Sequence, residues 1–481
     1  MQVRILLVDP PWYTLQGVNA ATVSLGLAAV AGVLEVRDHE VSIFNGDLYV
    51  SGERRRESTL TGNAVGPAVE HPAYQRLREV LRETRPEAVG ITSMTAEFPS
   101  ACVAAGIVRE EDAAVPIVVG GVHPTLVPEE VLSQRCFDYA VIGEGEETAT
   151  ALFNVLASGG NPESVTGIAY LCKEAVVHNA KRPLIQDLDA LPLPSYRGLI
   201  DRQAHIPAEL GGVISSRGCP YPCRYCASKV LWTRRVRFRS VQRVLEEITG
   251  LYRDGVRLFR LHDDTFTLRP ERVNDFCDGM QAFPDARWSC DTRVDLLDEA
   301  LARRMRAAGC YQVNVGIESG SERIRAMVAK KVDVARAEKL VRALKRCGIK
   351  VTAYFMAGFP TETGPELDET LALARVLSPD TPLFSVFTPY PGTELWDVLR
   401  REGKLPEQPD YSTFHHHSAA MNFSAMDEAE FSEQMQAVGT YETKQRRAAT
   451  LRYLLRHPLR FATDRRVMRP QLTRCFSGEL R

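Results

Sequence analysis

Short apolar runs alternate with longer segments of mixed polarity through the first 150 residues. The runs are rich in Val and Ile and are the expected strands, at residues 3–8, 40–44, 88–91, 117–119 and 139–142. The segments between them, such as 22–34 and 99–108, have the length of helices. Near-continuous apolar strands separated by helices are typical of a parallel sheet that is covered on both faces. We therefore expect an open, doubly wound α/β domain over residues 1–160.

Several of these strands run into polar or glycine-rich turns. In an open α/β sheet the ligand crevice lies outside the carboxyl ends of the strands. A ligand of this domain is therefore expected at the four turns Asp9-Pro10-Pro11, Thr92-Ser93-Met94-Thr95, Gly120-Gly121-Val122-His123-Pro124 and Gly143-Glu144-Gly145-Glu146.

The pattern changes after residue 160. Residues 167–171 and 175–178 have the alternation of a β-hairpin, and the segment 187–194 contains two prolines at alternate positions. Because proline interrupts a helix, we expect this segment to be a linker. A hairpin and linker over residues 161–204 would thus separate two domains.

A second series of strand–helix units runs from about Gly211 to Trp396. In one unit, Asp295 is the expected cap of a helix, Gly309 ends that helix, and residues 311–317 return as a strand. Repeats of this kind favour a barrel, or a partial barrel, of parallel strands. We expect about six strands within residues 205–402.

The remaining residues, 403–481, show no such repeat. They include His415-His416-His417 and a basic end over residues 453–469. Adjacent histidines rarely converge on one metal ion, and the basic end has the pattern of an amphipathic surface. We expect a small, mainly helical region.

Composition narrows the class of protein. The chain has 481 residues, of which 44% are hydrophobic, and 59 Lys and Arg against 61 Asp and Glu leave a net charge of −2. That balance favours neither nucleic acid nor an anionic membrane as a partner. The longest apolar run, 25–34, is too short to span a bilayer. Residues 3–8 follow the first methionine without a basic segment or cleavage site, so we expect a cytoplasmic protein.

Three of the eleven cysteines fall within eight residues, Cys219-Pro-Tyr-Pro-Cys223-Arg-Tyr-Cys226. An odd number of cysteines in such a chain argues against a disulfide framework. Three thiolates on one short loop can hold three irons of a [4Fe–4S] cluster and leave the fourth open. An open coordination position is what a catalytic metal centre requires. The alternative is a structural zinc site completed by a distant histidine.

This loop resembles the cluster loop of the radical S-adenosylmethionine (radical SAM) enzymes, whose C-x3-C-x2-C signature follows the first strand of a partial (β/α)6 barrel. The later strand ends match that pattern in order and spacing, at residues 262–267, 288–293, 316–321 and 358–362. The resemblance implies that Cys219, Cys223 and Cys226 are iron ligands. It also implies that S-adenosylmethionine is bound by Tyr225, Asp264, Glu318, Ser319 and Gly358. Helix capping and turn formation are the other interpretation of these residues.

The first domain resembles the cobalamin-binding domain that precedes the barrel in the cobalamin-dependent (class B) radical SAM group. The similarity lies in residues 25–29, 120–125 and 143–147. It implies that cobalamin contacts Pro10, Thr92, Ser93, Gly120, Gly121, His123, Gly143 and Glu144. The D-x-H-x-x-G motif that supplies a histidine to cobalt in some cobalamin proteins is absent, because Asp38-His39 lacks its spacing. His123, before a proline in a turn, is more typical of a hydrogen-bonding residue than of a cobalt ligand.

Together the resemblances imply an enzyme that cleaves S-adenosylmethionine at its cluster to a 5′-deoxyadenosyl radical. The radical abstracts hydrogen from an unactivated carbon, which methylcobalamin then methylates. The expected partners are a small-molecule or natural-product substrate and an electron donor such as flavodoxin or ferredoxin.

Two alternatives stay open. One keeps both cofactors but ends in cyclisation or rearrangement, and the other is a non-enzymatic corrin or iron–sulfur sensor. A methylthiotransferase is disfavoured, because Cys102, Cys136 and Cys172 are too scattered in sequence to form that class's second cysteine cluster. No motif specifies the substrate.

Overall fold

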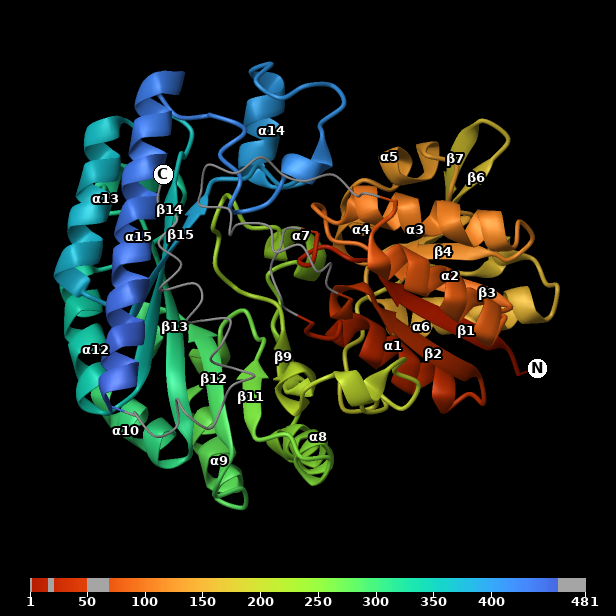
Figure 1. Ribbon diagram of the computed structural model, residues 1–481, viewed down its shortest axis with the longest axis horizontal. Coiled ribbons are helices and arrows are strands. Elements are labelled where there is room, and N and C mark those ends of the chain that lie inside the picture. The colour runs from red at the N-terminus through yellow and green to blue at the C-terminus, as the bar shows by residue number, and fades with distance from the viewer. Residues whose placement is uncertain (1, 16–20, 50–68, 457–481) are drawn as a thin grey trace.

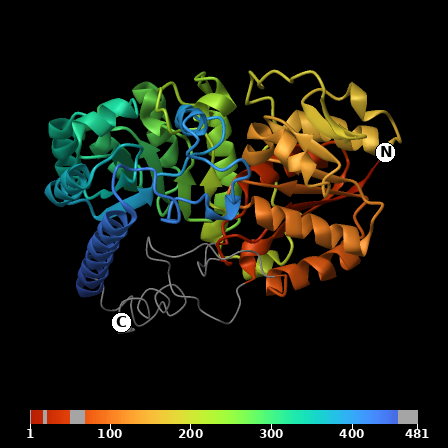
Figure 2. The same cartoon turned by 90° about the horizontal axis from the view of Figure 1, so that it is seen from above.

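Two sheets, one from each half of the chain, form the framework of the molecule and lie side by side (Figures 1 and 2). The computed structural model describes residues 2–15, 21–49 and 69–456. Within these ranges no helix is long and apolar enough to cross a membrane. The basic end expected over residues 453–469 lies almost wholly outside them, as does Cys475.

The first sheet has seven strands in the order β2-β1-β3-β4-β5-β6-β7. The first five are parallel and confirm the expected α/β domain. The hairpin β6–β7 adds to this sheet antiparallel to β5, so it belongs to the first folded unit and not to the linker. The strands are β1 (Arg4–Asp9), β2 (Glu40–Asn45), β3 (Ala88–Thr92), β4 (Ile117–Gly120), β5 (Tyr139–Val141), β6 (Ile168–Cys172) and β7 (Ala175–His178).

Helices cover both faces of this sheet because successive side chains along a strand point to opposite faces, and both faces are apolar. Ile5 and Leu7 of β1 pack with helices α1 and α6, whereas Leu6 and Val8 pack with α2 and α3 on the other face. The helices are α1 (Leu25–Glu35), α2 (Pro72–Thr84), α3 (Phe98–Glu111), the short α4 (Val122–Leu126) and α5 (Pro128–Ser133), and α6 (Gly145–Ala157).

The second sheet has six parallel strands in the order β15-β14-β13-β12-β11-β8, which confirms the expected partial barrel. Its strands are β8 (Gly212–Val213), β11 (Leu258–Leu261), β12 (Arg287–Thr292), β13 (Cys310–Glu318), β14 (Lys350–Ala357) and β15 (Thr381–Val386). A separate antiparallel pair, β9 (Ser216–Arg217) and β10 (Arg237–Phe238), flanks the cysteine loop.

The barrel helices pack on the outer face of this sheet (Figure 1). They are α8 (Val241–Arg253), α9 (Pro270–Met280), α10 (Glu299–Ala307), α12 (Val334–Arg346) and α13 (Gly364–Leu377). Three shorter helices of this half lie elsewhere: α7 (Ser228–Trp232) contacts α4, and α11 (Glu322–Met327) and α14 (Glu394–Arg401) contribute to the second apolar cluster.

The expected start of α10 is wrong by three residues. Asp298 caps this helix, because its side chain accepts a hydrogen bond from the Leu301 amide, while Asp295 lies in a preceding short turn. Leu297 is buried with an extended backbone, so the helix can begin only after it. Gly309, with φ +94°, follows the helix end as expected.

The C-terminal region closes the open side of the barrel. Helix α15 (Glu428–Arg456) packs on β15 and α13 (Figure 1), and Glu442 accepts a hydrogen bond from the Phe384 amide of that edge strand at 2.6 Å. Tyr411 reaches the first half of the chain and donates to Glu130 at 2.5 Å. This region therefore covers a sheet edge, which would otherwise expose unpaired backbone groups, and also joins the two halves.

Candidate functional site

The cysteine loop, residues 219–226, leaves β9 at the carboxyl end of the barrel sheet. A tight turn closes its second half, where the Cys226 amide donates to the Cys223 carbonyl at 3.2 Å. The Cys219 sulfur lies 3.8 Å from the Thr265 hydroxyl, and the Ser228 amide lies 3.5 Å from the Cys226 sulfur. All three thiols are free, so the structure presents three potential thiolate ligands on one loop.

Asp263, at the end of β11, anchors the chain just before this loop. Its carboxylate is 2% exposed and accepts from the amides of Ser215 and Ser216 at 2.7 and 3.1 Å, and from both hydroxyls at 2.5 and 2.7 Å. Arg272 also donates to the Ser215 carbonyl at 3.1 Å. Burial raises the pKa of Asp263. Four hydrogen bonds to one buried carboxylate hold the approach to Cys219 in a single conformation.

The three thiols do not have the arrangement of a zinc site. Among the described residues, no three Cys, His, Asp or Glu side chains converge on a point where one metal ion could be held. The thiolates of a cubane cluster bind three separate irons and are spread more widely. The described residues therefore show no ligand set for the single-ion alternative, at the cysteine loop or at His415–His417.

Glu318 lies at the end of β13, where the register with β14 shifts. Its φ of +71° is unusual for a residue with a side chain, and its carboxylate pairs with the buried Lys330 ammonium at 2.8 Å. Tyr225 lies beside it, and burial together with Glu318 raises the pKa of the Tyr225 phenol. The Tyr225 ring is also 5.9 Å from the Phe359 ring, next to Gly358. Tyr225 of the cysteine loop therefore lies beside Glu318, at the end of β13, and near Gly358, at the end of β14.

Ser319 and Asp264 have structural partners. The Ser319 side chain is fully buried, 3.0 Å from the Thr370 hydroxyl, and accepts from the Ser321 amide at 3.1 Å. Asp264 is exposed and accepts from the Ser228 hydroxyl at 2.8 Å, which ties the β11 end to the residue two positions after Cys226.

Glu362 organises the turn after β14. It is fully buried and accepts from the amides of Gly358 and Phe359 at 2.6 and 3.2 Å, and burial raises its pKa to about 8. Gly358, with φ +79°, supplies a backbone conformation that other residues rarely adopt.

The expected cobalamin residues gather at the carboxyl edge of the first sheet, here called the corrin edge (residues 9–14, 92–97, 120–125 and 143–146). The Ser93 amide donates to Gly120, and the His123 amide donates to Ser93. Gly121 has φ +107°, and a Cβ on it would lie 2.8 Å from the Ser93 carbonyl oxygen. The Gly143 amide donates to Thr125, which joins two of the turns. Because Gly121 has no room for a side chain, the backbone of this turn would face a large planar ligand.

Three carboxyl groups, those of Asp9, Asp47 and Glu97, lie at this edge as well, and the sequence pattern indicated only the turn that begins at Asp9. Asp47 accepts from the amides of Trp12 and Thr14 at 2.8 and 2.9 Å, which shapes the turn that begins at the buried Pro10. Burial raises the pKa of Asp47 to about 6 and that of Glu97 to about 7. The third is Asp9, whose pKa burial also raises.

The His123 side chain is completely enclosed. Its ring lies 4.5 Å from the rings of both Phe98 and Tyr411, and burial lowers its pKa to about 3. In the part of the chain that the structure describes, neither ring nitrogen has a hydrogen-bond partner. A contact between this ring and the corrin would require Phe98 or Tyr411 to move.

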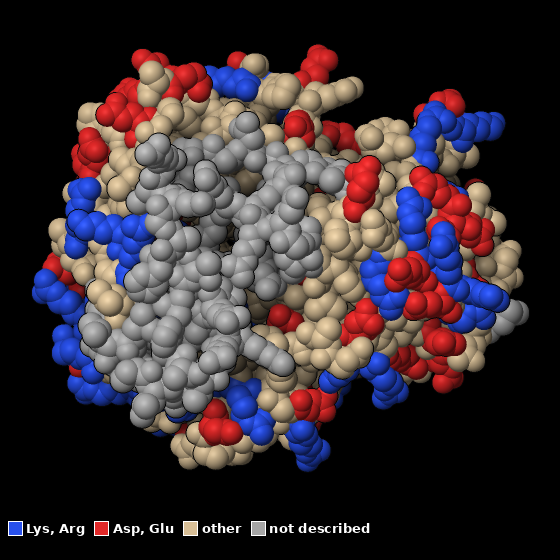
Figure 3. Space-filling view, in the orientation of Figure 1, with Lys and Arg blue, Asp and Glu red and all other residues tan. Residues whose placement is uncertain are grey.

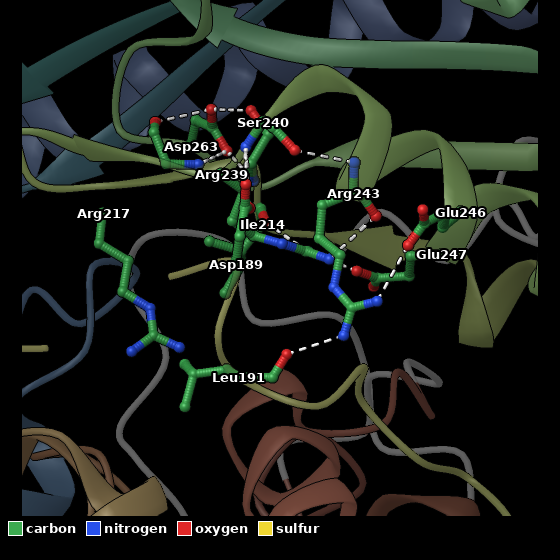
Figure 4. Close-up of polar contacts among 12 residues, drawn as sticks. Asp189, Leu191, Ile214, Arg217, Arg239, Ser240, Arg243, Glu246, Glu247 and Asp263 are labelled. Carbon is green, nitrogen blue, oxygen red and sulfur yellow. Dashed lines mark hydrogen bonds and ion pairs between the residues drawn. The ribbon is translucent and has the colours of Figure 1, made fainter. Parts of the chain in front are cut away.

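Glu144 connects the corrin edge to the chain ahead of the cysteine loop. Its buried carboxylate accepts from Arg217 of β9 at 2.5 Å, from Arg237 of β10 at 2.7 Å and from the Ile185 amide at 2.7 Å. Arg217 also pairs with Glu146. In Figure 4, Arg217 points away from the group around Asp263 and toward the first half of the chain. The Glu144 carboxylate therefore forms an ion pair with Arg217, which lies two residues before Cys219.

Around this junction the linker is also tied to the barrel (Figure 4). Asp189 accepts from the Ser240 amide at 2.9 Å, and the Leu191 carbonyl accepts from Arg243 at 2.9 Å. On the face shown in Figure 3, by contrast, the charged side chains over α2 and α3 pair with each other, as Arg76 does with Glu83 and Arg82 with Glu111. Such mixed-sign pairs form no basic surface for nucleic acid.

Comparison with known proteins gives a consistent result for both halves. A family model for the radical SAM superfamily matches residues 213–374, and one for the B12 binding domain matches residues 18–153. An uncharacterized methyltransferase of Pyrococcus horikoshii is 33% identical over 82% of this chain and 82% of its own. The anaerobic magnesium-protoporphyrin IX monomethyl ester cyclase of Cereibacter sphaeroides is 30% identical over 79% of this chain and 64% of its own.

Among solved structures, the radical S-adenosylmethionine methyltransferase TsrM from Kitasatospora setae, with cobalamin and a [4Fe–4S] cluster bound, has a similar fold. The TM-score is 0.66 at 19% identity, over 84% of this chain and 75% of that one. The similarity covers both sheets and their order along the chain.

Proposed function

The chain belongs to the cobalamin-dependent radical SAM methyltransferase family, and from this we propose that it methylates an unactivated carbon of a small-molecule substrate. Its cofactors are a [4Fe–4S] cluster, S-adenosylmethionine and cobalamin. When bound, they supply a 5′-deoxyadenosyl radical that removes a hydrogen atom, and a methyl group that replaces it. The protein's own task is to position the reacting groups and to exclude water.

We assign residues to these cofactors as follows. Cys219, Cys223 and Cys226 hold the cluster. Tyr225, Asp264, Glu318, Ser319 and Gly358 form the S-adenosylmethionine site, in which Ser319 acts through the turn that it stabilises. Pro10, Thr92, Ser93, Gly120, Gly121 and Gly143 form the cobalamin site, which His123 supports from behind. The domains are the cobalamin domain (1–160, to which the hairpin adds two strands), the linker (to 204), the barrel (205–402) and the C-terminal region (403–481).

One observation carries this proposal: the loops expected to hold the two cofactors are joined directly. The ion pairs of Glu144 and Glu146 with Arg217 connect the corrin edge to the strand that leads into Cys219. On the barrel side, the buried Asp263 fixes the same segment. A reaction that needs both cofactors on one carbon requires such a fixed distance between them.

Lys330 gives the S-adenosylmethionine site a defined charge. Its ammonium neutralises Glu318, while the Glu318 backbone keeps the carboxylate at the strand end beside Tyr225. We infer that the pair orients the polar end of S-adenosylmethionine, and that Tyr225 and Phe359 shield its apolar part from water.

The electron needed for radical formation comes, in this proposal, from a flavodoxin or ferredoxin in the cytoplasm. The substrate is a small molecule, as it is for the methyltransferases that this chain resembles.

A second candidate keeps the radical but not the methyl transfer. The 30% identity to an anaerobic cyclase favours it, since that relative shares both halves of this chain's organisation. The two candidates differ in whether the substrate gains a carbon atom.

The enzyme proposal is tested without a substrate. The protein is reconstituted anaerobically with iron, sulfide and hydroxocobalamin and is then reduced in the presence of S-adenosylmethionine. We expect S-adenosylhomocysteine, from methylation of the corrin, and 5′-deoxyadenosine, from cleavage at the cluster. A sensor would form neither product.

Cys223→Ala is expected to abolish the cluster absorption and the 5′-deoxyadenosine while cobalamin binding is retained. The control is Cys172→Ala, which removes an exposed thiol on β6 and should change neither property. Undiminished 5′-deoxyadenosine from the Cys223 variant would refute the assignment of this loop.

A further inference from the structure

The inner face of the barrel sheet is polar. Residues that point outward, such as Phe259, Trp288, Val313 and Phe355, are buried against the helices. Their neighbours in each strand point inward, and the strand registers place them side by side. These inward residues are Arg260, Ser289, Asp291, Gln312, Asn314, Thr352 and Tyr354. Barrel interiors are more often filled by branched apolar side chains, so this face is suited to a polar ligand.

Asp291 is the centre of a hydrogen-bond network on this face. It accepts from Asn314 Nδ2 at 2.9 Å, from the Tyr354 hydroxyl at 3.2 Å and from Arg260 Nη2 at 3.3 Å. The three donors come from β13, β14 and β11. A carboxylate with three donors has little capacity left for a substrate ammonium group.

Arg260 has hydrogen-bond donors that this network does not use. Its guanidinium carries five N–H donors, of which one bonds to Asp291 and another lies within hydrogen-bonding range of the Tyr354 hydroxyl, so at least three donors remain. The side chain is 48% exposed on the inner face, on the strand next to the edge strand β8. Asp291 therefore holds the guanidinium in place, while its other edge is available. A planar guanidinium with free donors matches the paired oxygens of a carboxylate or phosphate.

The position of Arg260 places it at the junction of the two halves. It is paired in register with Gly212 of β8, and a Cβ on Gly212 would lie 2.9 Å from the Leu25 side chain at the start of α1. Arg260 also lies within electrostatic range of Tyr13, in the turn after β1. A substrate that reaches both cofactors must pass this junction.

The opposite side of the junction is acidic. Tyr13 is influenced by Glu97, Asp47 and Asp9 of the corrin edge, and these charges, after burial, raise its pKa. These carboxyl groups offer no positive charge to an anionic group, which is attracted instead to the Arg260 guanidinium. The charges therefore favour one orientation of the substrate, with its anionic end on the barrel side.

We propose that Arg260 binds a carboxylate or phosphate group of the substrate, with Asp291 as the residue that positions the guanidinium. That the bound molecule is the substrate of methyl transfer rests on the proposed function, whereas anion binding by Arg260 can be tested separately. It restricts the substrate class to molecules that carry an anionic group.

The first test measures the site without any turnover. The reconstituted holoenzyme is treated with phenylglyoxal, which modifies accessible arginines, and modification of Arg260 is followed by peptide mass spectrometry. Inorganic phosphate and acetate are the two probes, and acetamide is the neutral control. Arg287, exposed at the other end of the sheet, is the internal reference.

We expect at least one anion to slow modification of Arg260 several-fold in a saturable way, with no change at Arg287. The anion that protects better identifies the preferred group. The proposal is overturned if neither anion protects, or if acetamide protects equally.

The second test concerns the substrate. An anaerobic metabolite extract is separated into anionic, neutral and cationic pools, and each is incubated with holoenzyme and S-adenosyl-[methyl-d3]methionine. We expect the label in a compound of the anionic pool. With Arg260→Gln the label should be lost, although cobalamin binding and 5′-deoxyadenosine formation persist, and Arg260→Lys should restore part of it.

Label in a neutral or cationic compound, or full labelling by Arg260→Gln, would contradict the proposal. If anions protect Arg260 but no pool is labelled by the parent enzyme, the anion site stands and the methyl-transfer function fails.

Discussion

His123 is expected to contact cobalamin, and the structure encloses its side chain in protein. It stands in a glycine-rich turn at the corrin edge, yet its ring is enclosed by Phe98 and Tyr411 and its nitrogens have no partner among the described residues. A buried polar group without a hydrogen bond destabilises the fold. We therefore propose that the neutral ring acts in packing, where it holds Tyr411 of the C-terminal region against the first domain behind the cobalamin site.

The pKa of about 3 makes this role testable by pH. The unfolded chain binds a proton at His123 below its ordinary pKa of 6.5, whereas the folded chain does so only near 3. Between these values the unfolded state binds more protons, so the stability that depends on a neutral His123 is lost as the pH falls.

We expect His123→Phe to lose less stability than the parent when the pH is lowered from 7 to 5, as measured by thermal unfolding. The corrin absorption spectrum should be unchanged. An altered cobalt spectrum, or an identical loss of stability in both proteins, would show that His123 has another role.

Residues that carry a motif could be predicted, and the residues that hold them in place could not. Cys219, Cys223 and Cys226 have a spacing that chance rarely produces. Asp263 and Lys330 have no such spacing, because their partners lie 47 and 48 positions before Asp263 and 12 before Lys330. Only the fold brings these charges to buried positions.

At the scale of elements, the short β9–β10 pair connects the barrel to the corrin edge. It presents Arg217 and Arg237 to Glu144, and all three side chains are largely buried. Removing one member of a buried ion pair leaves its partner uncompensated, which costs about 3–5 kcal/mol. The pair of strands thus acts as the attachment of the barrel to the corrin edge.

We expect Arg217→Gln to lower the free energy of unfolding by about 3 kcal/mol. Chemical denaturation measures this directly. The matched control is Arg78→Gln, whose partner Glu110 is well exposed and whose loss should cost less than about 1 kcal/mol. Equal effects of the two substitutions would mean that the Arg217 contact does not stabilise the junction.

The elements themselves were predictable where their pattern is local. The parallel strands of both halves follow from their apolar runs and the helices between them. The hairpin within residues 161–204 is confirmed, but its sequence does not show that it pairs with the edge of β5 and so extends the first sheet. Asp295 is the wrong cap because a helix that includes Leu297 fits the apolar spacing, whereas the extended backbone of the buried Leu297 leaves Asp298 as the cap.

For the whole molecule, at least three separate contacts among the described residues join the two halves. These are the Glu144 ion pairs, the contact of Leu25 with the barrel at Gly212, and the bond of Tyr411 to Glu130. The third involves the C-terminal region, which also covers the edge of β15. The chain therefore has the contacts of a single cooperative structure.

We expect one unfolding transition in calorimetry, with the calorimetric enthalpy close to the van't Hoff value. Glu442→Ala, which removes the acceptor for the edge-strand amide of Phe384, should lower the transition temperature without splitting it. Two resolved transitions in the parent protein would mean that the halves unfold independently.

The central claim is that both cofactors act on one carbon atom. Holoenzyme, S-adenosyl-[methyl-d3]methionine and the anionic metabolite pool are incubated anaerobically, and product, S-adenosylhomocysteine and 5′-deoxyadenosine are measured together by mass spectrometry. The account predicts a product that carries the three deuterons, formed in equal amounts with both by-products. A product formed with 5′-deoxyadenosine but without deuterium or S-adenosylhomocysteine would contradict methyl transfer and indicate the cyclase chemistry.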